Sequence, residues 1–154
     1  PERSSAASDV YKRQIIGTLV MGYLGDKYSK KILLSGLYFL RGITLILFIF
    51  LPASNLSAVL FGTSFGLLWL ATVPATNGIV AQIFGTKNLS LLFGIVFLNH
   101  QFGSFLGAYL GGYFYDQFGS FDYAWYLAIV LSFVATALHL PIDEKPLATV
   151  DKTI

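Results

Sequence analysis

Long runs of apolar residues, separated by short polar connections, make up most of the chain. Four runs are about as long as the 17 to 25 residues that an α-helix needs to cross a bilayer; they lie at 32–51, 56–84, 89–114 and 124–140. A shorter apolar run at 15–24 cannot cross alone, and we interpret it as the last turns of a truncated span. The pattern therefore predicts one partial and four complete membrane helices over residues 15–140.

The polar connections carry the residues that end helices. Proline, glycine and small polar residues fill three of them, at 52–55, 85–88 and 117–122. Pro141 ends the last apolar run and begins a polar tail at 141–154. Because terminal polar segments without apolar anchors are poorly ordered, we expect this tail to be disordered.

Composition agrees with a membrane protein. The chain is 55% hydrophobic and 12% charged, whereas soluble domains carry about 25% charged residues. Its net charge of +2 is small and no basic run alternates with aromatic residues, which argues against a nucleic-acid partner. No cysteine is present, so disulfides and thiolate chemistry are excluded. No spacing of histidines and acids is typical of a metal site, and no motif predicts a cofactor.

The first fourteen residues differ from the rest of the chain. Residues 1–14 are polar, and Asp-Val-Tyr-Lys-Arg-Gln at 9–14 resembles a translated sequencing adapter. The segment lacks the apolar stretch of a signal peptide. We interpret residues 1–14 as a non-native, adapter-like segment. We therefore expect the native protein to extend upstream of Ile15 and this chain to be a carboxy-terminal fragment.

Lysines are placed asymmetrically among the connections. They lie in the connection at 22–31, in the connection at 85–88 and in the tail, whereas the connections at 52–55 and 117–122 contain no lysine or arginine. Because cytoplasmic loops are enriched in basic residues, this alternation predicts that the lysine-bearing connections and the carboxyl terminus are cytoplasmic. We expect an integral protein of a bacterial inner membrane.

Glycines recur at helical spacing in two of the runs. Gly103, Gly107 and Gly111 follow one another at intervals of four, and Gly62 and Gly66 form a pair. Small residues at this spacing let two helices approach closely in lipid, so these glycines are predicted to serve helix packing. The alternative is that membrane helices merely tolerate them.

Two segments carry a family resemblance. Residues 22–31, Gly-Tyr-Leu-Gly-Asp-Lys-Tyr-Ser-Lys-Lys, resemble the cytoplasmic signature Gly-x-Leu-x-Asp-Arg/Lys-x-Gly/Ser-Arg/Lys-Arg/Lys of the major facilitator superfamily. Residues 111–122 resemble the end of span eleven in its monocarboxylate-porter-like members. The resemblance implies an all-α membrane protein that contains the end of span eight and spans nine to twelve, part of the carboxy-terminal six-helix half of the bundle.

The resemblance also implies a role for the signature. In the family the aspartate of this loop, here Asp26, closes the cytoplasmic side against a helix of the opposite half, and the basic residues add contacts that break on opening. The gating motif then consists of Gly22, Leu24, Asp26, Lys27, Lys30 and Lys31. The alternative is that Asp26 and the lysines only cap helix ends and fix the topology.

Arg41 lies in the middle of an apolar run, where an unpaired charge costs about 2.5–3.5 kcal/mol. No acidic residue lies at a similar depth, so its partner is the backbone, the missing half or an anionic substrate. The resemblance makes this run span nine, at the periphery of the bundle, which favours structural pairing over substrate contact.

His100 and Ser104 are neighbours on one face of the run at 89–114. The resemblance makes this run span eleven, which lines the cavity of the family. His100 is therefore a candidate for substrate binding or proton coupling, because imidazole titrates near neutral pH. The alternative is a hydrogen bond between helices.

Three polar residues of the run at 56–84 are further candidates. Thr72 and Thr76 share a face, and Asn77 lies about 100° further round the helix. Pro74 between them frees a backbone carbonyl. These residues either line the cavity or kink and pack the helix.

Together these features predict a secondary transporter of a small organic solute, which works by rocking two halves around a central site. The resemblance and Arg41 favour an organic anion, and proton symport, facilitated passage and efflux remain open. Its expected partners are the missing amino-terminal half, the bilayer, the substrate and protons. No nucleophile elbow or phosphate loop predicts an enzyme. The alternatives are a non-transporting membrane subunit and a membrane-embedded enzyme.

Overall fold

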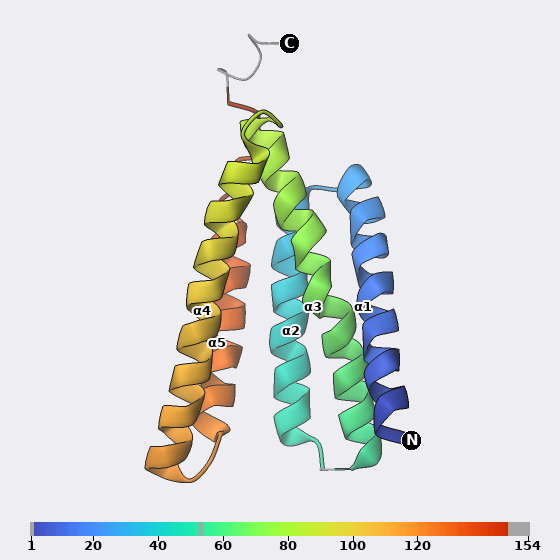
Figure 1. Cartoon of the computed structure of the whole chain (residues 1–154), viewed down its shortest axis with the longest axis vertical. Helices are drawn as coiled ribbons and strands as arrows, with labels where there is room; N and C mark the ends of the chain where they lie inside the picture. The colour runs from blue at the N-terminus through green and yellow to red at the C-terminus, as the bar shows by residue number, and fades with distance from the viewer. Residues whose placement is uncertain (1, 53, 148–154) are drawn as a thin grey trace.

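The chain folds into five long helices. The computed structural model describes the backbone of residues 2–52 and 54–147, and the side chains of these ranges except those of residues 2–11 and 13. The helices are α1 (Glu2–Lys27), α2 (Lys30–Phe50), α3 (Asn55–Phe84), α4 (Leu89–Phe118) and α5 (Asp122–His139) (Figure 1). Helices α2 to α5 are long and apolar enough to cross a membrane. The prediction of an all-helical membrane protein is confirmed.

The helices end at residues whose backbone cannot continue them. Leu51 adopts an extended conformation directly before Pro52, as a residue before proline does. Gly85 and Gly119 end α3 and α4 with positive φ angles of 74° and 69°. At the start of α3, the hydroxyl of Ser54 accepts a hydrogen bond from the backbone amide of Ser57 at 3.1 Å.

Two boundaries differ from the sequence prediction. Helix α4 continues to Phe118, four residues beyond the predicted end at 114, because Gly119 is the first residue there to take up a positive φ. Helix α1 runs without a break from Glu2 to Lys27, across the predicted boundary between residues 14 and 15. The non-native origin of residues 1–14 stays a prediction.

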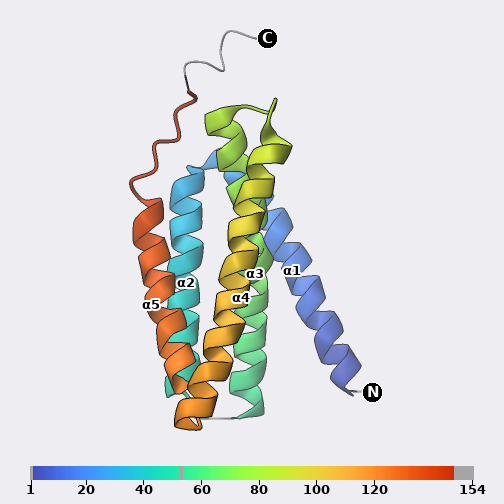
Figure 2. The ribbon, with the colours of Figure 1, turned by 60° about the vertical axis from the view of Figure 1, so that its left-hand side comes forward.

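Helices α1, α2 and α3 hold the core. Seven residues form it: Met21, Leu34, Leu37, Ala71, Ala75, Ile79 and Val80. Helix α1 packs so closely on α3 that a Cβ at Gly17 would collide with the carbonyl group of Leu67. The hydroxyl of the buried Ser35 donates to the carbonyl oxygen of Thr136 at 2.8 Å, which ties α2 to α5. Figure 2 shows α5 beside α2.

Helix α4 is loosely attached. It meets α3 near their connection and diverges from it toward the opposite end (Figure 1). No described residue of α4 or α5 is buried. The lysine-bearing connections, α1–α2 and α3–α4, lie at the same end of the bundle as residues 141–147, which follow α5 (Figure 1). This common end is what the alternation of lysines requires.

The first part of the tail is held against the bundle. The backbone amide of Leu147 donates to the carbonyl oxygen of Ile83 at 2.9 Å, and Glu144 bonds to the start of α2. The expectation of disorder is therefore wrong for residues 141–147, because their polar groups satisfy free backbone groups at helix ends. Residues 148–154 lie outside the described residues.

Candidate functional site

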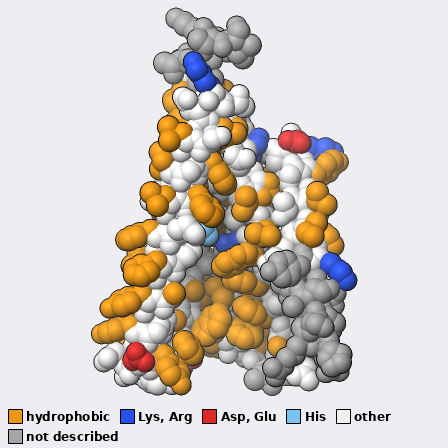
Figure 3. Space-filling model, viewed as in Figure 1, with side chains coloured by type: hydrophobic (Ala, Val, Ile, Leu, Met, Phe, Trp, Pro, Cys, Tyr) orange, Lys and Arg blue, Asp and Glu red, His pale blue; other side chains and the backbone are white. Residues whose placement is uncertain are grey.

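A cavity of about 600 Å³ lies between α2, α3, α4 and α5. Four of the candidate residues line it, one each from α2 and α3 and two from α4: Arg41, Thr72, His100 and Ser104. Each lies near the middle of its helix, so the cavity lies at mid-depth in the bundle. Most of the remaining lining is apolar, and Figure 3 shows a hollow on this face among hydrophobic side chains.

Arg41 is tied to the backbone of α3. Its Nη2 donates to the carbonyl oxygens of Leu68 and Trp69, each at 2.7 Å, and lies 3.5 Å from the hydroxyl of Thr72. The guanidinium also lies over the rings of Tyr38 and Trp69, 5.2 and 5.3 Å from their centres. Of the three partners that the sequence left open, the structure shows the backbone.

This arrangement leaves a positive charge without a carboxylate. Hydrogen bonds to a charged group contribute about 1.5–3 kcal/mol each, enough to offset the cost of holding arginine at this depth. None of the cavity-lining residues is acidic. The buried Nε of Arg41 has no hydrogen-bond partner among the described residues. The cavity thus contains a fixed cation whose charge is balanced only by carbonyl dipoles and ring faces.

His100 presents its ring to this cavity. The ring stacks on that of Phe97 with 6.0 Å between centres, and its nitrogens have no hydrogen-bond partner in the described part of the chain. The hydroxyl of Ser104 donates to the carbonyl oxygen of His100 at 3.0 Å, within their own helix. The interhelical hydrogen bond that was the alternative role for His100 is thus not made within 2–52 and 54–147.

Thr76 and Asn77 lie outside the cavity. Both are half-buried on α3, and the buried Oδ1 of Asn77 lacks a hydrogen-bond partner within the described residues. The structure therefore brings Thr72 to the cavity and leaves Thr76 and Asn77 apart from it.

Sequence reasoning missed two polar lining residues. Tyr38 precedes Arg41 by one helical turn, and Ser132 enters from α5. The spacing of Tyr38 from Arg41 was a usable signal, because residues three apart share a helix face. Ser132 gave no such signal, because a serine in a membrane helix commonly donates its hydroxyl to a carbonyl of its own helix and then marks no site. Its hydroxyl does so here, to the carbonyl oxygen of Ala128.

The predicted packing glycines have few close neighbours. A Cβ added at Gly62, Gly103, Gly107 or Gly111 would meet no described atom within 4 Å. Gly103 lines the large cavity, and Gly62 and Gly66 line a second one of about 290 Å³. The close contacts fall on Gly17, Gly42 and Gly78 instead. A packing role for the glycines of α4 stays a prediction.

The gating motif occupies the end of α1 and the start of α2. Gly22, Asp26 and Lys27 are exposed and Leu24 is half-buried. The side chain of Asp26 makes no hydrogen bond or ion pair with any described residue, and Lys27 donates to the hydroxyl of Tyr23.

Lys30 and Lys31 of the motif are engaged elsewhere in the chain. The Nζ of Lys30 donates to the side-chain oxygen of Gln82 at 2.9 Å, and the Nζ of Lys31 donates to the carbonyl oxygen of Ile142 at 2.8 Å. The motif therefore has two parts, one bonded to other segments of the bundle and one that is not.

Glu144 belongs to the same network. Partial burial alone would raise the pKa of its carboxyl group. The hydrogen bonds from the hydroxyl of Ser29 and from the backbone amides of Lys31 and Lys30, with the charge of Lys30, outweigh burial and lower this pKa below its ordinary value of 4.5. Glu144 is therefore ionised at neutral pH.

A helical membrane bundle around a cavity at mid-depth that contains a few polar side chains is typical of a membrane transport protein. The chain belongs to the Major Facilitator Superfamily, whose sequence profile matches residues 13–153. It is 32% identical over 137 residues to an uncharacterized MFS-type transporter, YcxA, of Bacillus subtilis (strain 168). That match covers 86% of this chain and 33% of the relative, so the chain spans about a third of the relative's length. No solved structure matches the chain significantly.

Proposed function

We propose that the chain is part of a secondary active transporter that carries a small organic anion by alternating access. Family membership supports a membrane transporter in general. The cavity between α2, α3, α4 and α5 is the substrate site of this proposal, since its volume of about 600 Å³ falls within the range of small-molecule pockets.

The choice of an anion depends on one observation. Arg41 lines the cavity, and no acidic residue lines it. In a site surrounded by apolar side chains and lipid, the potential of one cation is little screened and favours a negative solute. Arg41 then acts as the electrostatic anchor. The hydroxyls of Thr72 and Ser104 donate to the carbonyl oxygens of Trp69 and His100 in this structure, so each would have to turn away from its own helix to donate to the solute.

His100 is the proton-coupling residue of the proposal. Its ring nitrogens have no described partner and face the same cavity as Arg41. Protonation of this ring would add a second positive charge to the cavity. Protonation would thus strengthen binding of the anion, which is the linkage that symport requires.

The proposal includes partners beyond this chain. The exposed face of α4 and the unpaired Asp26 would contact the remainder of the transporter, in which Asp26 helps to close the cytoplasmic side. The lysine-bearing end would face the cytoplasm of a bacterial cell, in agreement with the positive-inside rule.

Uptake by the complete transporter in proteoliposomes tests the anion directly. Labelled lactate is compared with lactamide, a neutral solute of nearly the same shape. We expect uptake of lactate over lactamide, and a loss of about tenfold or more in Arg41→Gln because a charge-assisted contact is removed. Arg41→Lys should retain part of the activity, since it keeps the charge but not the planar fork.

Lys87→Gln is the matched control, because it removes a cation that lies in an exposed connection. Equal uptake of the two solutes, or full lactate uptake by Arg41→Gln, would contradict an anion site at Arg41.

A further inference from the structure

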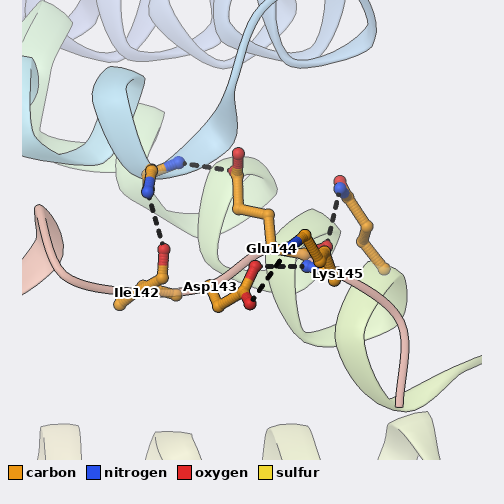
Figure 4. A network of polar contacts seen from close by, with 6 residues as sticks. Ile142, Asp143, Glu144 and Lys145 are labelled. Atoms are coloured by element: carbon orange, nitrogen blue, oxygen red, sulfur yellow. Dashed lines mark hydrogen bonds and ion pairs between the residues drawn. The ribbon is translucent and has the colours of Figure 1, made fainter. Parts of the chain in front are cut away.

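Residues 141–147, which we name the tail strap, run from the end of α5 across the start of α2 to the end of α3 (Figure 4). The strap lies at the end of the bundle that holds the gating motif. Its contacts join segments that are more than one hundred residues apart in the chain. Nothing in the sequence pattern of a polar tail predicts them.

Glu144 caps the start of α2, although it lies far from that helix in the sequence. Its Oε2 accepts from the hydroxyl of Ser29 at 2.6 Å, and its Oε1 accepts from the backbone amide of Lys31 at 2.8 Å. Ser29 is the residue that precedes α2, yet its own side chain caps no amide, and the first turn has no acidic residue. The first amides of a helix need an acceptor and favour a negative charge. Glu144 supplies both.

The strap also bonds to the end of α3. The backbone carbonyl oxygen of Glu144 accepts from the side-chain amide of Gln82 at 3.0 Å, and that side chain in turn accepts from Lys30. The backbone amide of Leu147 donates to the carbonyl oxygen of Ile83 at 2.9 Å. One short segment thus satisfies free groups at two helix ends.

The neighbouring acid shows that charge alone does not explain the network. Asp143 is exposed, and its ion pair is with the equally exposed Lys145 at 4.0 Å. An exposed pair of this kind contributes little. Asp143 is therefore a matched control for Glu144, since it lies in the same segment and carries the same charge.

We propose that Glu144 is a positioning residue for the gating motif, which it acts on through the tail strap. The strap holds Lys30 and Lys31 within this part of the bundle and leaves Asp26 and Lys27 for contacts with the rest of the transporter. The ends of α2, α3 and α5 then move as one unit when the cytoplasmic side opens. The role of Glu144 in opening depends on the proposed transport function. The contacts of the strap do not depend on it.

Amide exchange and lysine acetylation test the strap in the membrane-inserted chain. In Glu144→Ala we expect the amides of the first turn of α2 to exchange about five- to tenfold faster, the effect of losing a helix cap. Lys30 and Lys31 should be acetylated faster, while Lys27 in the same molecule keeps its rate. Asp143→Asn should leave both readouts unchanged.

Two milder variants keep the proposal testable if Glu144→Ala fails to fold. Ser29→Ala removes a hydroxyl donor, and Glu144→Gln removes the charge while it keeps the shape. Both should accelerate exchange in the first turn of α2 by less than Glu144→Ala. If amide exchange and lysine acetylation are unchanged in all three variants, the proposal that the strap holds the start of α2 is refuted.

Uptake by the complete transporter tests the positioning role separately. Glu144→Ala should change the maximal rate of uptake and leave KM for lactate unchanged, because the strap does not line the cavity. A released strap with an unchanged maximal rate would refute the role in opening. An unmodified transporter that takes up no lactate would instead refute the proposed substrate and leave the exchange result standing.

Discussion

The two sides of the bundle differ in packing although both are built from apolar helices. Helices α1, α2 and α3 enclose the buried core and α5 packs along α2, whereas α4 has no buried residue among those described and touches α3 and α5 only sparsely. Lipid is as apolar as leucine, so burial of apolar area does not drive membrane helices together as it does in water. Tight contact occurs where glycine allows it, as at Gly17, or where a polar group demands a partner, as at Ser35.

The loosely packed side is also the side that forms the cavity. His100 and Ser104 face it from α4, and Arg41 faces it from α2, at the edge of the packed side. A cavity between a rigid part and a loosely attached helix can change volume as that helix moves. In the transporter that we propose, α1–α3 would then provide stability and movement of α4 would provide access to the cavity.

The largest predicted contrast is between leucines on the two sides. Leu34 is 1% exposed in the core, and Leu98 is 69% exposed on α4. We expect Leu34→Ala to lower the free energy of unfolding by about 2 kcal/mol or more, since it leaves a cavity that neighbouring side chains cannot fill. Leu98→Ala should change it by less than about 0.5 kcal/mol.

Unfolding of the chain in bicelles with a denaturing detergent measures both values. Equal losses for the two substitutions would mean that α4 is packed as tightly as α2, which would break the comparison.

The sequence predicted the helices well because their signals are local. Each of the four long apolar runs has about the length of a span, glycine directly follows α3 and α4, and proline lies two residues after the end of α2. The resemblance at residues 22–31 indicated the correct family, and Arg41, singled out by its place in an apolar run, lines the cavity. These inferences need only neighbouring residues and known helix geometry.

Packing faces and the strap could not be predicted because they depend on distant partners. Gly103, Gly107 and Gly111 share a face by spacing, yet the close approaches are made at Gly17 and Gly42. Glu144 gives no capping signature, because its partners Ser29 and Lys31 lie more than one hundred residues earlier. The spacing of glycines shows where helices are able to approach, and only the fold shows where they do.

A smaller predicted effect is that acid weakens the first turn of α2 and not the first turn of α3, which lies at the opposite end of the packed helices. The folded state lowers the pKa of Glu144, so the strap is at full strength above pH 4.5 and is lost as the pH falls through the lowered pKa. The other charged groups around Glu144 are Lys30 and Lys31 of α2 and the pair of Asp143 and Lys145 in the strap itself.

Amide exchange in the first turn of α2, corrected for the intrinsic effect of pH, should therefore accelerate below pH 4.5. The first turn of α3, which Ser54 and Ser57 cap without an ionisable group, is the internal control. Parallel pH profiles in the two turns would exclude Glu144 as the source.

The central claim is that an anion binds in the cavity between the packed and the loosely packed sides. The chain has no natural cysteine, so a single Ser104→Cys reports on this cavity alone. In the complete transporter, freed of any other cysteines, the rate of labelling by a small thiol reagent is measured with lactate or lactamide present, and Thr76→Cys, outside the cavity on α3, serves as the control. The account predicts that lactate slows labelling at position 104 and that lactamide does not, with no effect at position 76. Labelling at position 104 that is equally fast with both solutes and without them would contradict it.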